Sequence, residues 1–185
     1  MKTNLNGLKV AILVADGFEE RELTGPRKAL DEAGATTLIV SPNKEKVYGC
    51  NHREAGGEFK VDVHLDKAAA DDFHALLLPG GVINADHLRM QPKAVAFVKK
   101  FAEQSKPIAS MCRGPWTLIE AGIVQGKTMT SWPSIKTDLR NAGAKWGDRD
   151  GVVDQGLVTS RMPDDIPAFN ATLIEQFALG IPAHR

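Results

Sequence analysis

The chain has 185 residues, of which 43% are hydrophobic and 25% are charged. These values are typical of a globular protein and exclude a disordered or collagen-like chain, and the length is that of a single domain, residues 1–185. Twenty-three Lys and Arg residues balance 23 Asp and Glu residues. A formal net charge of zero argues against a protein that binds nucleic acid electrostatically.

Short apolar runs alternate with segments of helical periodicity along most of the chain. We predict strands at residues 8–15, 36–40, 75–78, 107–111, 128–130, near 152 and at 157–159, and helices at residues 19–33, 93–104, 115–121, 134–141 and 166–179. Residues 45–63 are polar and rich in glycine, which indicates an antiparallel excursion. The alternation predicts an α/β three-layer sandwich with a mostly parallel sheet, in which ligands bind at the carboxyl ends of the strands.

Two cysteines, Cys50 and Cys112, are too few for a disulfide scaffold. No segment reaches the roughly 18 apolar residues that a membrane span requires. The apolar run near the start is short and is followed at once by acidic residues, unlike a signal peptide. We therefore expect a cytoplasmic protein that has neither a membrane nor a nucleic acid as its partner.

The segment around Cys112 carries the most chemical information. A predicted strand passes into a predicted helix through one sharp turn, with the small residues Ser110 and Gly114 two positions on either side of Cys112. This is the pattern of a nucleophile elbow, which exposes the central side chain at the edge of the sheet. The amino end of a helix also favours the thiolate form of a cysteine. A small buried hydrophobe at a strand end is the alternative interpretation.

Two further segments are expected at the same edge of the sheet. Glu19 follows the first strand, and a carboxyl beside a thiolate would be driven toward its protonated form and could transfer a proton; an acidic residue in a first helical turn is the ordinary alternative. The turn that contains Gly81 could bring its backbone N–H to a ligand. Together with the backbone N–H of Arg113, it would form an oxyanion hole.

Other functional motifs have little support. The histidines form no metal-binding pair and no cysteine cluster accompanies them, so we expect no metal. Nucleotide-binding glycine motifs are missing from the sequence, so we expect no cofactor. Cys50 lies in the polar excursion without an elbow, and we expect no special role for it.

At these motifs the sequence resembles the PfpI-type intracellular protease family, in the superfamily of the parkinsonism-associated protein deglycase. The resemblance runs from about residue 10 to 178 and rests on the segments DGFEEREL (16–23), LLPGG (77–81), MCRGPW (111–116), WPSIKTDL (132–139) and TSRMPDD (159–165). It implies a flavodoxin-like sandwich, the fold of class I glutamine amidotransferases, and a homo-oligomer that is at least a dimer. It also implies a reactive cysteine paired with a glutamate, which we assign to Cys112 and Glu19.

The sequence departs from the protease-type members at one informative position. Those members carry a histidine after the cysteine, whereas this chain has Arg113. Arginine remains protonated and cannot shuttle a proton, which weakens a peptidase mechanism. The acidic third residue of the family, which can come from a neighbouring subunit, falls near Asp86, and His87 is a candidate for a displaced base.

Several functions are compatible with these residues. Cys112 could attack a small electrophile, such as methylglyoxal or its early adducts on proteins, without a cofactor and with Glu19 moving the proton. Cys112 could instead be a stress-responsive thiol that a small oxidant converts to a sulfenic or sulfinic acid. A cysteine peptidase and a non-catalytic chaperone-like role are the remaining alternatives.

Overall fold

The computed structural model describes residues 3–180. Its central sheet consists of β11 (Val152–Asp154), β12 (Leu157–Ser160), β8 (Ile108–Met111), β7 (Ala75–Leu78), β1 (Lys9–Leu13), β3 (Thr36–Ser41) and β6 (Val63–His64), in that spatial order. Only the β11–β12 pair within this described sheet is antiparallel. The mostly parallel sheet confirms the predicted α/β class.

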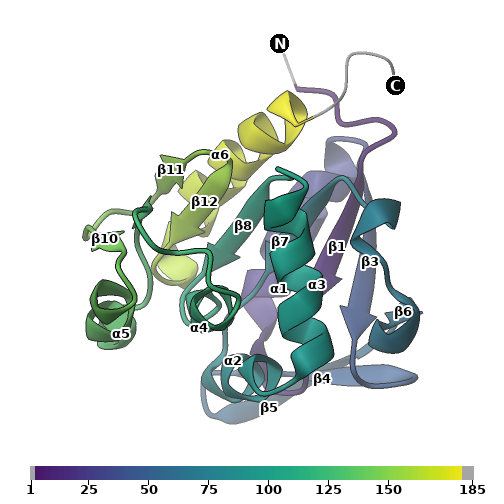
Figure 1. Ribbon diagram of the computed structural model, residues 1–185. Coiled ribbons are helices and arrows are strands. Elements are labelled where there is room, and N and C mark those ends of the chain that lie inside the picture. Colours follow the sequence, from purple (N-terminus) through teal and green to yellow (C-terminus); the bar gives the residue numbers. More distant parts are fainter. Residues whose placement is uncertain (1–2, 181–185) are drawn as a thin grey trace.

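Helices cover both faces of this sheet (Figure 1). One face packs against α1 (Glu20–Glu32) and α6 (Ile166–Leu179). The other packs against α2 (Val82–Arg89), α3 (Pro92–Glu103), α4 (Pro115–Glu120) and α5 (Lys136–Asn141). Side chains alternate along β1: Val10 and Ile12 enter the first core, and Ala11 and Leu13 enter the second. The alternation explains why residues 10–13 are all apolar, because both faces of the strand are buried there.

Two small sheets lie beside the central one. The excursion predicted at 45–63 forms an antiparallel hairpin of β4 (Lys46–Asn51) and β5 (Glu54–Lys60), and β4 also pairs with β2 (Phe18–Glu19). The strand predicted near residue 128 is β9 (Thr128–Met129), which pairs with β10 (Lys145–Trp146) outside the central sheet. No helix between residues 3 and 180 is long and apolar enough to span a bilayer.

Two differences from the predicted elements affect the site. Helix α1 begins at Glu20, so Glu19 remains in the extended segment β2. Helix α2 was not predicted, because its eight residues are of mixed polarity and lack a clear apolar stripe. It begins directly after Gly81, whose φ of 91° allows the chain to turn sharply out of the strand β7.

Candidate active site

Cys112 occupies the turn between β8 and α4 at the carboxyl end of the central sheet. Its φ is 58°, a left-handed backbone conformation that is uncommon for a residue other than glycine. The backbone holds it there, because the Cys112 N–H donates to the Ser160 carbonyl at 3.1 Å and the Cys112 carbonyl accepts from the Trp132 N–H at 2.9 Å. The predicted elbow is therefore present, although the Cys112 side chain is largely buried.

Gly80 brings a second strand end against this elbow. A Cβ atom at Gly80 would lie 2.8 Å from the Cys112 Cβ and 2.9 Å from the Arg113 nitrogen, so only glycine fits without displacement. On the other side of the cysteine, the buried Ser110 hydroxyl donates to the Leu78 carbonyl at 3.1 Å. These contacts lock β7 and β8 together below the thiol.

Glu22 supplies the carboxyl that lies beside Cys112. The side chain is fully buried in the first turn of α1, and its Oε1 accepts a hydrogen bond from the Gly80 N–H at 2.8 Å. The other oxygen, Oε2, is buried without a hydrogen-bond partner, although the carboxyl interacts with the Cys112 thiol. Burial raises the pKa of Glu22 to about 8. Glu22 is therefore mostly protonated at neutral pH and can donate to a neighbouring sulfur.

The pKa of the Cys112 thiol responds to its neighbours in opposite directions. Burial raises it most, and a charged Glu22 would raise it further, whereas the positive charge and backbone N–H of Arg113 lower it. Two negative charges side by side in this buried position are unfavourable. Together these effects raise the pKa of Cys112. Cys112 and Glu22 are a coupled pair that loses its two protons in separate steps, so the first deprotonation leaves a single negative charge on the pair.

The assignment of Glu19 as the carboxyl against Cys112 needs correction, because Glu22 occupies that position. Glu19 precedes the helix and pairs with Cys50 in the neighbouring strand, whereas Glu22 lies three residues later, on the buried face of α1. Glu19 still lines the same pocket. One signal in the sequence would have identified Glu22: it falls on the apolar stripe of α1 with Leu23, Pro26 and Leu30, where a carboxyl is unexpected.

The two predicted oxyanion donors also lie at the pocket. Gly81 and Arg113 both line it, and the Arg113 N–H bonds the Cys112 sulfur. A Cβ at Gly81 would lie 2.6 Å from the Glu19 nitrogen, which explains the glycine. The Arg113 guanidinium lies over the Trp132 ring, 5.5 Å from its centroid. Stabilisation of an oxyanion by these N–H groups stays a prediction.

Asp86 and His87 are not brought to Cys112 within the chain. Both are exposed on α2 and neither lines the pocket. Asp86 accepts from Arg89 at 2.8 Å, and the His87 ring contacts Gln91 at 3.0 Å. Because α2 begins directly after Gly81, these residues fall one turn away from the pocket, on the outer side of the helix. A contribution from Asp86 across a subunit interface stays a prediction.

The hairpin adds two pocket residues that the sequence reasoning missed. Cys50 and His52 lie on and just after β4, and both line the pocket with Cys112. The Cys50 thiol donates to the Gly17 carbonyl at 3.4 Å. Burial, with a smaller effect of Glu19, raises the pKa of this thiol, which keeps it protonated. Cys50 therefore lies at the pocket, and the expectation that it has no special role stays a prediction.

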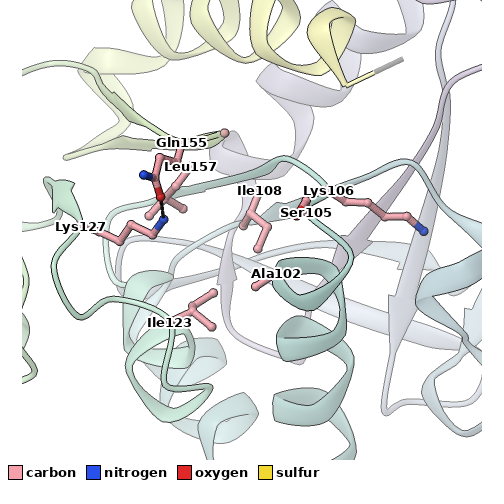
Figure 2. Close-up of a pocket in the computed structure, with 9 residues that line it drawn as sticks. Ala102, Ser105, Lys106, Ile108, Ile123, Lys127, Gln155 and Leu157 are labelled. Atoms are coloured by element: carbon pink, nitrogen blue, oxygen red, sulfur yellow. Dashed lines mark hydrogen bonds between the residues drawn. The ribbon is translucent and has the colours of Figure 1, made fainter. Parts of the chain in front are cut away.

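The pocket over Cys112 is small, with a volume of about 140 Å³. Its lining residues come from six separate parts of the chain: Gly17, Glu19, Glu22, Cys50, His52, Gly81, Val82, Ile83, Cys112, Arg113, Trp132 and Pro163. Figure 2 shows a larger cavity of about 280 Å³ at the opposite end of β8, where Lys127 donates to Gln155. None of the residues lining that cavity is a Cys, His, Asp or Glu. The pocket over Cys112 is therefore the candidate active site.

Known proteins are similar to this chain over nearly its whole length. The model of the DJ-1/PfpI family matches residues 8–176. General stress protein 18 of Bacillus subtilis is 42% identical over 165 residues, which cover 89% of this chain and 94% of that protein. A deglycase of Thermococcus kodakarensis is 42% identical over 162 residues, which cover 88% of this chain and 95% of that protein.

Solved structures agree with these relatives. Schizosaccharomyces pombe DJ-1 is 29% identical with a TM-score of 0.79, and the match covers 91% of each chain. Drosophila melanogaster DJ-1beta is 26% identical with a TM-score of 0.84, covering 92% of this chain and 90% of that one. The agreement confirms the flavodoxin-like sandwich. Family model, curated relatives and solved structures all extend over the elbow and its pocket, and the chain belongs to the DJ-1/PfpI family.

Proposed function

We propose that this protein is a cofactor-free, cysteine-dependent enzyme of the stress response that acts on small reactive carbonyls, such as methylglyoxal or its early adducts on proteins. The observation that carries the proposal is the pairing of Cys112, held in a nucleophile elbow, with a buried Glu22 that is mostly protonated at neutral pH. The names of relatives as a deglycase and as a general stress protein support it.

The geometry supports a simple first step. The Cys112 thiolate attacks the aldehyde carbon, a C–S bond forms, and the electrons of the C=O double bond move to the oxygen. The proton of Glu22 is available to that oxygen, while the N–H groups of Gly81 and Arg113 are placed to stabilise its negative charge. No step requires a metal or an added electron carrier, because the reaction only rearranges bonds and protons.

Peptidase activity has weaker support. Arg113 occupies the position of the histidine in protease-type members and cannot accept a proton. The pocket of about 140 Å³ admits a compound of a few heavy atoms more easily than an extended peptide. A small carbonyl substrate therefore fits the site better.

The proposal is tested by following the loss of methylglyoxal with fully reduced protein and with Cys112→Ser. We expect turnover by the wild-type protein and its loss in the variant, because a hydroxyl without a strong base is a poor nucleophile. Cys50→Ser is the matched control, since it removes the other thiol of the pocket. Equal methylglyoxal loss in the wild type and in Cys112→Ser would contradict the proposal.

A further inference from the structure

We propose that His52 and Glu19 form an acid–base pair at the Cys112 pocket, which accepts the proton of the water that releases the product from Cys112. This inference rests on the proposed role of Cys112 as the nucleophile. It supplies a proton acceptor at the mouth of the pocket, because Arg113 cannot accept a proton and Glu22 is fully buried.

Glu19 fixes the position of His52 through its two carboxyl oxygens. The backbone N–H of His52 donates to Glu19 Oε2 at 3.0 Å. The ring nitrogen Nδ1 of His52 lies 3.7 Å from Glu19 Oε1. Oε1 is buried and has no hydrogen-bond partner within the described residues. The side chain of Glu19 is 8% exposed and that of His52 is 75% exposed. A buried carboxylate oxygen without a hydrogen bond thus faces an exposed imidazole, and a small ring movement would complete their hydrogen bond.

The neighbouring Arg21 determines which ring nitrogen carries the proton. Its guanidinium Nη2 lies 3.1 Å from His52 Nε2 and 3.5 Å from Glu19 Oε1. A guanidinium has donors only, so Nε2 must be the acceptor and the proton of the neutral ring lies on Nδ1, which faces Glu19. A proton-accepting histidine requires this arrangement, in which a carboxylate faces the Nδ1–H group and Nε2 is left as the basic nitrogen. Arg21 is half exposed and has room to release Nε2.

The chemistry of product release requires such a group. A proton shift within the adduct of methylglyoxal and Cys112 gives an acyl thioester. The oxygen of a water molecule then attacks the acyl carbon, a C–O bond forms, the C–S bond breaks, and its electron pair leaves on Cys112 as a thiolate. The water proton passes to His52 Nε2, and the Glu19 carboxylate stabilises the imidazolium until the proton passes to solvent.

The ester p-nitrophenyl acetate separates the two halves of this cycle without an aldehyde substrate. Attack by Cys112 releases a burst of p-nitrophenolate and leaves acetyl-Cys112, whose hydrolysis sets the later steady rate. We expect His52→Ala to retain the burst and to lower the steady rate by about 100-fold, the usual effect of a general base. Acetyl-Cys112 should then accumulate in the intact mass, and added imidazole should restore the steady rate.

Two further variants sharpen the experiment. Glu19→Gln keeps an acceptor for the backbone N–H of His52 and removes the negative charge of the Glu19 carboxylate. We therefore expect the burst of p-nitrophenolate to be retained and the steady rate to be slower. Arg53→Gln alters the next residue of the hairpin, which is exposed and does not line the pocket, and should leave both phases unchanged.

The outcomes separate the two proposals. An unchanged steady rate in His52→Ala, or a slowed rate that imidazole does not restore, overturns the role of His52 and leaves Cys112 as the nucleophile. Loss of the burst in His52→Ala also overturns it, since release alone should be affected. A wild-type protein without any burst contradicts the proposed function at Cys112, and the role of His52 fails with it.

Discussion

At the scale of single residues, the site depends on a buried carboxyl that is neutral at physiological pH. Glu22 accepts a hydrogen bond from the Gly80 N–H and interacts with the Cys112 thiol, and Glu19 and Arg21 also act on its charge. Its ionisation would place a negative charge where water cannot reach it. Protein stability and reactivity of the thiol therefore both depend on the proton that Glu22 holds.

The pKa of Glu22 makes stability depend on pH. It is raised in the folded state from 4.5 to about 8, so the folded protein binds this proton more tightly than the unfolded chain between those values, and stability falls as pH rises through that window. We expect a loss of about 4 kcal/mol between pH 5 and pH 8 from this group, as an order of magnitude.

Glu22→Gln is the comparison that isolates this effect. The amide keeps an acceptor for Gly80 and does not titrate, so the pH dependence should be much weaker in the variant. Urea denaturation at pH 5 and at pH 8 measures it for both proteins. If the unfolding free energy of the wild type and of Glu22→Gln changed equally between pH 5 and pH 8, Glu22 would not be the titrating group.

At the scale of elements, helix α2 connects the loops that carry the site. The Asn84 side chain is completely buried; its Oδ1 accepts from the Ala15 N–H at 2.7 Å, and its Nδ2 donates to the carbonyls of Pro79 and Gly80 at 3.2 and 2.9 Å. One amide thus ties the ends of β1 and β7 to the first turn of α2. Gly80 and Gly81, which contact Cys112 and Glu19, depend on this arrangement.

Replacing Asn84 by alanine should therefore weaken the whole edge of the sheet. The Ala15 N–H and the Pro79 carbonyl would lose their partner, while the Gly80 carbonyl would keep its bond from the Glu19 N–H. We expect the unfolding free energy to fall by about 2–3 kcal/mol. His87→Ala, an exposed change on the same helix, should alter it by less than about 0.5 kcal/mol. Urea denaturation of both variants measures this difference, and equal effects would contradict the proposed role of Asn84.

At the scale of the whole molecule, one sheet is shared by two hydrophobic cores. The core on the α1 and α6 face contains Phe169, Leu173 and Phe177, all fully buried. Trp116 and Trp146 pack against the other core. Because the central strands contribute alternate side chains to both cores, the loss of one core should destabilise the other.

Phe177→Ala tests this dependence. Removing a fully buried phenylalanine should cost about 3–5 kcal/mol, and tryptophan fluorescence should report the same shift in Tm as far-UV circular dichroism. Leu179→Ala, a change at a position that is 77% exposed in the same helix, is the control. Two separate transitions would contradict the prediction that residues 1–185 form one domain.

The sequence by itself determined the features that depend on neighbouring residues along the chain. Buried strands show as continuous apolar runs, the small residues around Cys112 indicate an elbow, and Gly81 marks the turn after β7. Each of these signals is local, because backbone conformation and side-chain alternation are set within a few residues. The fold class and the elbow at Cys112 could therefore be predicted.

Only the tertiary structure decided which side chains surround Cys112. A shift of one residue in the start of α1 leaves Glu19 in a strand and turns Glu22 inward. The pairing of β2 with β4 brings Cys50 and His52 to the pocket from more than 30 positions away, whereas Asp86 and His87 turn outward on a helix that was not predicted. Apart from Glu22, whose place on the apolar stripe of α1 is a local signal, these contacts depend on packing between distant segments, which a local pattern does not report.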